Sequence, residues 1–272
     1  MIAAWIILTV LIVLFVLFVL SMAVRTGREE LKAFQGFAYA HRGLFGEGVP
    51  ENSMAAFRRS LAGGYGIELD VHLMNDGNLA VIHDSSLLRT AGVDVKIEDL
   101  TAEDLKNYPL EGTQEIIPLY SQVLELYAGK APIILELKPA GGNIAALTEA
   151  ACKIMEDYSG AYCMESFDPR CIRWLKKNRP QVIRGQLSEN YFAGTKAKIP
   201  AYLKLVLSNH LLNFMTRPDF IACRYRDRNL WTTRLCRSLW EPACVTWTVQ
   251  TQEELDTAVK EGWIPIFEGF TP

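Results

Sequence analysis

Short apolar segments alternate with amphipathic helical patterns along most of this 272-residue chain. Eight of these segments have the length and composition of strands, and helical patterns separate nearly all of them. They are residues 37–41, 66–73, 131–138, 161–167, 182–187, 220–225, 243–249 and 263–269. Eight is the number of strands that closes a parallel barrel, so the sequence predicts an α/β protein with a (β/α)8, or TIM, barrel.

A doubly wound open sheet is the alternative, because periodicity alone does not distinguish a closed sheet from an open one. The first strand is followed by neither GxGxxG nor GxxxxGK[ST], the nucleotide-binding motifs typical of such sheets. Residues 79–83, which follow a turn at 75–77, are predicted to leave the main sheet as a short excursion.

Two connections depart from a simple alternation of strands and helices. The sequence reaches Pro272 directly after the eighth strand, without the usual closing helix. We expect residues 26–36, or a partner chain, to cover that edge of the barrel. The stretch 187–218 is longer than a connection needs and contains a predominantly helical pattern at 196–214. An ordinary barrel helix is the favoured interpretation, and a membrane-facing or substrate-gating insertion is the alternative.

Residues 1–24 contain no charged side chain. As a helix they would extend roughly 36 Å, enough to cross a hydrocarbon core of about 30 Å. A cleaved signal peptide would need a basic start, a shorter apolar run and a small-residue cleavage site, so a membrane anchor is preferred. The predicted organisation is a transmembrane anchor at 1–24, a linker at 25–36 and a barrel domain at 37–272.

Charge predicts how the anchor is oriented. Arg25, Arg28 and Lys32 follow the apolar segment, whereas only the α-amine precedes it, so the positive-inside rule places the barrel in the cytoplasm of a single-pass membrane protein. The six cysteines are scattered without a CxxC motif, which favours buried free thiols, although their even number also permits disulfides. The formal net charge of -3 argues against nucleic acid as a partner.

Chemistry in a parallel barrel lies at the carboxyl ends of the strands, and the polar residues of this chain fall there. Glu68, Asp70 and His72 alternate along the second strand, so their side chains share one face. The remaining polar residues at strand ends are His41, Arg42, His83, Glu136 and Lys138. His210, the fourth histidine, lies among leucines and is predicted to be structural.

The carboxylates lie in apolar strands, where an unpaired charge would cost several kcal/mol. Glu68, Asp70 and Glu136 facing one cavity would form a hard-oxygen site suited to Ca²⁺ or Mg²⁺. An ion-pair network with Arg42 and Lys138 is the alternative explanation for their burial.

The histidines and cations next to these carboxylates suggest a reaction. His41 and His83 flank the candidate metal site and have the chemistry of a general acid and a general base. Arg42 and Lys138 would supply positive charge for an anionic substrate, most simply a phosphate. Together these groups predict phosphoester cleavage.

The same residues, in this order, resemble the glycerophosphodiester phosphodiesterase family. The matching motifs are His41-Arg42-Gly43, Glu51-Asn52-Ser53, Glu68-Leu69-Asp70, Asp76-Gly77 with His83-Asp84, Leu135-Glu136-Leu137-Lys138, Ser166-Phe167 and Trp247-Thr248-Val249. The match runs from about residue 39 to residue 272. Two departures stand out: the family's ENT is ENS here, and its closing GI-x-TD-x-P motif is reduced to residues 266–272 without the Asp.

The resemblance implies a TIM barrel that hydrolyses glycerophosphodiesters to an alcohol and glycerol 3-phosphate with a divalent metal. It also implies roles for individual residues. Glu68, Asp70 and Glu136 would bind the metal, His41 and His83 would be the acid and base, Arg42 and Lys138 would bind phosphate, Trp247 would form a wall against the glycerol, and Glu51 and Asn52 would support the site.

Because a tethered enzyme meets membrane-derived molecules at raised effective concentration, the anchor favours glycerophosphodiesters or lysophospholipids at a membrane surface as substrates. One alternative is a phospholipase of the same superfamily, either phospholipase D-like or phosphoinositide-cleaving. Another is a catalytically idle barrel that binds phospholipid headgroups, although both histidines and all three carboxylates are present.

Overall fold

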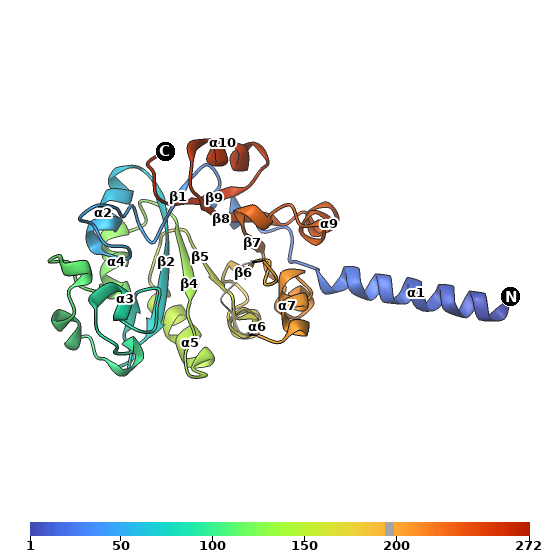
Figure 1. The fold of residues 1–272 in the computed structure, drawn as a ribbon, viewed down its shortest axis with the longest axis horizontal. Coiled ribbons are helices and arrows are strands. Elements are labelled where there is room, and N and C mark those ends of the chain that lie inside the picture. Colours follow the sequence, from blue (N-terminus) through green and yellow to red (C-terminus); the bar gives the residue numbers. More distant parts are fainter. Residues whose placement is uncertain (194–198) are drawn as a thin grey trace.

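Eight parallel strands close into a barrel in the computed structural model, which describes residues 1–193 and 199–272 (Figure 1). The barrel strands are β1 (Tyr39–His41), β2 (Gly66–Leu73), β4 (Ile133–Leu137), β5 (Tyr162–Ser166), β6 (Arg184–Ser188), β7 (Phe220–Arg224), β8 (Ala243–Val249) and β9 (Ile264–Phe267). β1 pairs in parallel with both β2 and β9, so the sheet closes on itself. The predicted barrel is confirmed.

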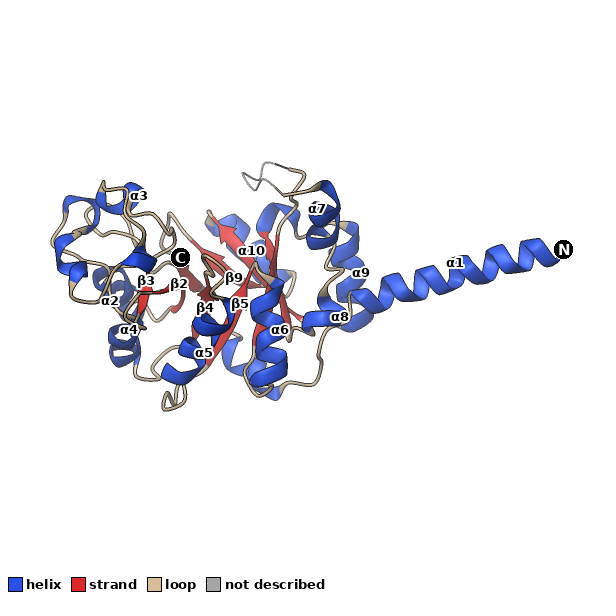
Figure 2. Cartoon of the chain, turned by 90° about the horizontal axis from the view of Figure 1, so that it is seen from below, coloured by secondary structure: helices blue, strands red, loops and turns tan. Residues whose placement is uncertain are grey.

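Helices cover the outside of the barrel between successive strands (Figure 2). They are α2 (Met54–Ala62), α4 (Tyr120–Tyr127), α5 (Ile144–Ile154), α6 (Pro169–Asn178), α7 (Ala201–Ser208), α8 (Asn213–Thr216), α9 (Trp231–Trp240) and α10 (Gln252–Lys260). Side-chain caps begin several of them: Ser53 accepts a hydrogen bond from Ala56 N, and Asp168 accepts one from Arg170 N. These local signals fix where a helix starts between two strands.

The predicted excursion after β2 is also present. β3 (Leu79–Val81) pairs antiparallel with β2, and the chain then builds a small lobe before α4. The lobe has its own apolar cluster, which includes Leu87, Ile97 and Leu105. Its short helices are α3 (Leu88–Ala91), η2 (Ile97–Asp99), η3 (Asp104–Asn107) and η4 (Leu110–Gly112), and a further short helix, η5 (Tyr225–Asp227), follows β7. The lobe carries His83 to the rim of the barrel.

Residues 26–36 do not cover the edge after the last strand. The short helix η1 (Glu29–Phe34) instead packs Leu31 and Phe34 against apolar side chains that include Ile134 and Phe220. These side chains come from the amino-terminal halves of β4 and β7, so η1 closes the bottom of the barrel. The expected cover fails because the apolar side chains of η1, Leu31 and Phe34, are packed in the bottom of the barrel.

The last five residues instead pack beside β9, where the sequence had predicted a missing closing helix. Phe270 packs against Phe267 with ring centroids 5.6 Å apart, and Tyr65 packs against Phe267 at 5.0 Å. The Tyr65 hydroxyl donates a hydrogen bond to the backbone oxygen of Pro272 at 2.8 Å. A short aromatic cluster thus occupies the place where a closing helix was expected.

The first helix, α1 (Ile2–Ser21), projects from the barrel with most of its surface exposed (Figure 1). Its length and mean hydropathy of 3.2 are sufficient for crossing a membrane. The residues just after it enter the barrel wall, where Met22 and Val24 are buried and Arg25 forms an ion pair with Asp219. The first part of the expected linker is therefore packed against the barrel.

The long connection before β7 contains two helices, α7 and α8. The segment between them includes His210, which has φ of 59°. Residues 196–198 of the predicted helix lie outside the described residues. His210 is buried, and its Nε2 lies 3.0 Å from Thr233 Oγ1, in accord with a structural role. All six cysteines are free and buried, as the first interpretation of their spacing predicted.

Candidate active site

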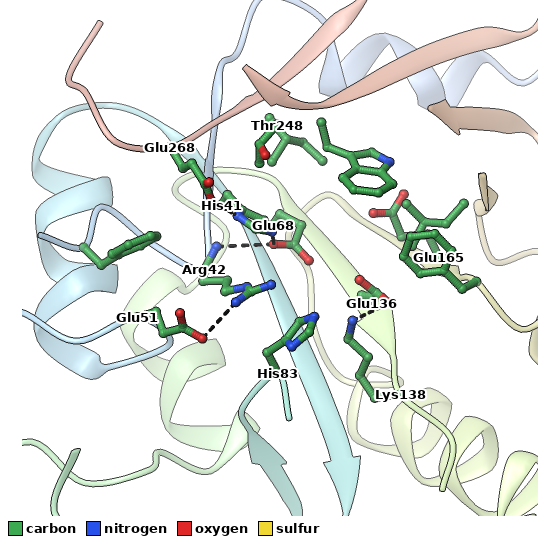
Figure 3. Close-up of a pocket in the computed structure, with 15 residues that line it drawn as sticks. His41, Arg42, Glu51, Glu68, His83, Glu136, Lys138, Glu165, Thr248 and Glu268 are labelled. Carbon is green, nitrogen blue, oxygen red and sulfur yellow. Dashed lines mark hydrogen bonds and ion pairs between the residues drawn. The ribbon is translucent and has the colours of Figure 1, made fainter. Parts of the chain in front are cut away.

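A cavity of about 390 Å³ opens at the carboxyl ends of the barrel strands (Figure 3). It brings together most of the polar residues that the sequence singled out. Its lining residues are His41, Arg42, Phe45, Glu51, Glu68, His83, Glu136, Lys138, Glu165, Phe167, Leu187, Trp247, Thr248, Ile266 and Glu268. This is where a parallel barrel places its chemistry.

Three buried carboxylates lie on two neighbouring strands. Glu68 and Asp70 alternate along β2, and Glu136 on β4 is the register partner of Asp70. One oxygen of each lies within 4.8 Å of the others, and the side chains are almost inaccessible to solvent. The strand period and parallel register together produce this cluster, as the sequence predicted.

His72, the third polar residue on that face of β2, has a different position. Its Nδ1 lies 2.6 Å from Glu98 Oε1, and its Nε2 lies 3.1 Å from the backbone oxygen of His83. His72 thereby holds the backbone of His83 at the rim of the cavity.

The two predicted cations contact the carboxylates directly. Lys138 Nζ lies 2.7 Å from Glu136 Oε1 and 3.1 Å from Asp70 Oδ1. Arg42 Nη1 donates to Glu51 Oε1 at 2.9 Å, and its Nε lies 3.5 Å from Asp70 Oδ2. The ion-pair network that sequence analysis considered as an alternative to metal binding is therefore present beside the carboxylate cluster.

The network does not fully compensate the carboxylates. Burial, reinforced by the charge of Asp70, raises the pKa of Glu68 well above its ordinary value. Burial also raises the pKa of Glu136 to about 7, even though Lys138 opposes the shift. Burial disfavours the charged form of Asp70 too, but Lys138 and Arg42 outweigh it and hold its pKa well below the ordinary value. With all three carboxylates ionised, the cluster would carry more negative charge than Lys138 and Arg42 balance.

A fourth buried carboxylate, Glu165 on β5, lies beside Glu136 in the sheet register and lines the same cavity. Within the described part of the chain, its Oε2 has no hydrogen-bond partner. Burial, with the added charge of Glu136, raises its pKa well above the ordinary value. An excess of hard oxygen ligands around one space fits a divalent cation such as Ca²⁺ or Mg²⁺.

Each cavity histidine has a carboxylate at its Nδ1. His41 Nδ1 lies 2.5 Å from Glu268 Oε2, and His83 Nδ1 lies 2.7 Å from Asp84 Oδ1. Because a carboxylate accepts hydrogen bonds, Nδ1 carries a proton in both rings and Nε2 is left for other partners. Burial, together with the charges of Lys138 and Arg42, lowers the pKa of His83 to about 4. His83 is therefore neutral at pH 7.

Glu51 and Asn52 contact the cations and one of the buried carboxylates. Asn52, with φ of 54°, donates from Nδ2 to Asp70 Oδ2 at 3.0 Å. Left-handed backbone of this kind is less costly for Asn than for most residues with a side chain. Glu51 accepts hydrogen bonds from both Arg42 and Arg89.

Trp247 also lines the cavity. Its ring meets Phe167 edge to face, with centroids 5.4 Å apart. Lys138 Nζ lies 5.9 Å from the centroid of the Phe167 ring. Trp247 and Phe167 thus form an aromatic side of the cavity next to Lys138.

Three residues of the site were not identified as functional from the sequence. Glu268 appeared only as part of a degraded motif, and Glu165 lay unremarked in a strand. Arg89 bridges Glu51 and Asp84, so it links the partner of Arg42 to the partner of His83. The one available signal was the placement of Glu165 and Glu268 at the ends of barrel strands.

A parallel barrel whose strand ends gather acids, imidazoles and cations around one cavity is suited to hydrolysis of anionic esters. Residues 41–268 match the model of the glycerophosphoryl diester phosphodiesterase family. The chain belongs to this family and is a phosphoric diester hydrolase of the glycerophosphodiester phosphodiesterase class.

Relatives of this chain include enzymes with two kinds of named activity. A glycerophosphodiester phosphodiesterase of Caldanaerobacter subterraneus subsp. tengcongensis is 29% identical over 235 residues, covering 82% of this chain and 89% of that protein. A lysophospholipase D of Rattus norvegicus is 36% identical over 112 residues, which cover 36% of this chain and 35% of that protein.

Solved structures share the fold. A phosphodiesterase of Oleispira antarctica, determined in complex with the product sn-glycerol-3-phosphate, has a TM-score of 0.70 at 20% identity and covers 87% of this chain and 94% of that one. A glycerophosphodiester phosphodiesterase of Thermotoga maritima has a TM-score of 0.66 at 23% identity, covering 86% and 95%.

Proposed function

We propose that this chain is a membrane-anchored, metal-dependent enzyme that hydrolyses glycerophosphodiesters to an alcohol and glycerol 3-phosphate. One observation carries the proposal: the cavity of a member of this family holds three buried carboxylates, two cations and two histidines whose Nδ1 atoms are paired with carboxylates. Phosphodiester cleavage needs a metal site, proton-transfer groups and positive charge for the phosphate, and these three sets of residues could supply them.

Glu68, Asp70 and Glu136 would hold the metal ion, Ca²⁺ or Mg²⁺. Support comes from their mutual proximity, their burial and the raised pKa values of Glu68 and Glu136. A bound divalent ion would supply positive charge that stabilises the phosphoryl oxygens in the transition state. The same ion would compensate the buried carboxylates.

His41 and His83 exchange protons with the reacting groups through Nε2. One imidazole accepts the proton of the attacking hydroxyl or water as its oxygen bonds to phosphorus. The bond from phosphorus to the leaving alcohol then breaks, and the other imidazole donates a proton to that oxygen. Where a substrate hydroxyl attacks, this step leaves a cyclic phosphodiester, which water opens to glycerol 3-phosphate with the same two imidazoles. Glu268 and Asp84 keep each ring in the orientation and tautomer that this exchange needs.

Arg42 and Lys138 would bind the phosphate oxygens, and Trp247 would pack against the glycerol. Lys138 projects into the cavity close to Glu136. In the view of Figure 3, His83 lies between Lys138 and Arg42. Two cations at this position favour an anionic substrate. The aromatic side leaves an apolar surface for the carbon skeleton.

The membrane part of the proposal rests on α1. Its 20 residues would span about 30 Å, the thickness of a hydrocarbon core. Arg25, Arg28 and Lys32 follow it and favour a cytoplasmic barrel in a single-pass protein. A tethered enzyme would meet membrane-derived substrates at raised effective concentration.

A lysophospholipid is the second candidate substrate, because a lysophospholipase D is among the relatives. A panel of glycerophosphocholine, glycerophosphoethanolamine, glycerophosphoglycerol and lysophosphatidylcholine separates the two activities when products are identified by ³¹P NMR. We expect glycerol 3-phosphate from the glycerophosphodiesters. Release of lysophosphatidic acid alone would favour the second candidate, and no product from any of the four would overturn the proposal.

A further inference from the structure

Large apolar side chains lie exposed on the part of the barrel from which α1 projects. Helices α8 and α9 lie at the base of α1 in Figure 2, with α7 beyond α9, and α7 and α9 lie on either side of that base in Figure 1. Four of their side chains are each more than half exposed, and we call them the base surface: Tyr202, Leu205, Phe214 and Trp231. Large apolar side chains exposed on neighbouring helices are typical of a site of contact.

The base surface is fixed relative to α1. The rings of Phe18 and Trp231 stack with centroids 5.7 Å apart. Asn213 Nδ2 donates to the backbone oxygen of Met22 at 3.3 Å, and Met22 is fully buried. The end of α1 is therefore held by α8 and α9, so the orientation of the helix determines where the base surface lies.

This attachment sets the depth of the surface. Phe18 lies three residues before the end of α1, which corresponds to about 4.5 Å along the helix. If α1 spans a hydrocarbon core of about 30 Å, its last turn lies at the boundary of that core. Trp231, stacked on Phe18, then lies at the depth where Trp and Tyr accumulate in membrane proteins.

Positive charge accompanies the apolar groups. Lys176 of α6 donates from Nζ to the backbone oxygen of Met215 in α8 at 2.9 Å, and Arg173 Nη1 lies 3.8 Å from the sulfur of Met215. Burial and the charges of nearby arginines, with Arg217 the strongest, lower the pKa of Lys176. A cluster of like charges beside an apolar surface is suited to anionic lipid headgroups.

We propose that the base surface lies in the headgroup region of the bilayer that α1 crosses, as a second membrane contact favoured by anionic lipid. The proposal rests on the membrane part of the proposed function. This second contact would fix the orientation of the barrel relative to the bilayer.

The test uses the full chain in vesicles of phosphatidylcholine and phosphatidylglycerol. A single cysteine introduced by Leu205→Cys carries an environment-sensitive fluorophore, and the six native cysteines are buried. The matched control is Leu88→Cys, since Leu88 is 58% exposed and Leu205 is 54% exposed. Leu88 belongs to α3, at the opposite end of the molecule from α1 (Figure 1). Activity towards soluble glycerophosphocholine checks that each labelled protein is folded.

We expect lipids brominated in their acyl chains to quench the label at position 205 at least about twofold, and the label at position 88 hardly at all. Quenching at position 205 should weaken when phosphatidylglycerol is omitted. Tyr202→Cys provides a second position with the same expectation. Equal and weak quenching at positions 205, 202 and 88 would overturn the inference.

A label at Leu14→Cys, within α1, separates this inference from the proposed anchor. If position 14 is quenched and position 205 is not, α1 crosses the bilayer while the base surface stands in water, and only the inference fails. If position 14 is not quenched either, the proposed anchor fails as well. A label at 205 that is shielded only at high protein density, whatever the lipid, would show that a second copy covers the surface.

Discussion

The two ends of the barrel interior differ sharply in what they bury. At the carboxyl end the strands bury carboxylates, among them Asp70 and Glu136, against Lys138. At the amino end η1 inserts Leu31 and Phe34 among other apolar side chains. The first end holds charge at an energetic cost, whereas the second gains from the hydrophobic effect.

This difference separates function from stability within one barrel. Substitutions at the carboxyl end should remove activity and leave the fold intact, and substitutions at the amino end should do the reverse. The following predictions test that separation, beginning with the largest expected effect.

His83→Ala and His41→Ala remove a proton-transfer group from the cavity. We expect each to lower kcat by about 100-fold to 10,000-fold while the melting temperature stays close to that of the wild type. Hydrolysis of glycerophosphocholine and thermal unfolding measure the two quantities. Wild-type turnover in either variant would remove that histidine from the mechanism.

Phe34→Ala removes an aromatic ring from the bottom of the barrel. We expect a loss of about 3 to 5 kcal/mol in the free energy of unfolding, because the ring is buried and leaves a cavity. Below the melting temperature, kcat should match that of the wild type. A large fall in kcat with unchanged stability would contradict the separation of the two ends.

Asp84→Asn and Glu268→Gln change the partners of the histidines and leave the histidines themselves. An amide cannot stabilise a protonated imidazole as a carboxylate does, so we expect a loss of about 10-fold to 100-fold in kcat. Measured pH profiles should shift as well, which a purely structural role would not produce. Unchanged profiles and rates would show that the pairs at Nδ1 do not act in catalysis.

His210 lies in the barrel wall, away from both ends, and burial lowers its pKa to about 4. The unfolded chain therefore binds more protons between about pH 4 and pH 6.5, so this contribution to stability is complete above pH 6.5 and is lost as the pH falls. We expect a slope of up to about 1.4 kcal/mol per pH unit from this group. His210→Asn, which tolerates the positive φ, should flatten the slope in denaturant titrations. A slope unchanged by the substitution would assign the acid sensitivity to other groups, including those of the cavity.

The sequence predicted the barrel and most of the cavity because both follow from local patterns. Alternation along β2 places Glu68 and Asp70 on one face, and parallel strands bring their carboxyl ends to one rim. The partner of His41, by contrast, is Glu268, 227 positions further along the chain. Arg89 joins Glu51 to Asp84 from within the lobe. Such pairings depend on how loops pack, which periodicity does not encode.

The covering of the barrel ends was predicted less well for a related reason. Residues 26–36 have too little periodicity to indicate which surface they meet, and their apolar side chains suit either the open edge or the barrel bottom. Leu31 and Phe34 pack among side chains from several strands at the barrel bottom, and this tertiary arrangement does not follow from the local pattern. Phe270, after β9, packs beside Phe267 of that strand, and Tyr65 packs against the same ring and donates to Pro272 O.

The central claim is that the carboxyl end of the barrel buries charge because it holds a divalent ion for phosphodiester cleavage. The most direct measurement follows glycerol 3-phosphate released from glycerophosphocholine by the full chain, first after treatment with EDTA and then after Ca²⁺ or Mg²⁺ is added back separately. We predict that EDTA abolishes release and that at least one of the two ions restores it. Full activity in EDTA would contradict the claim.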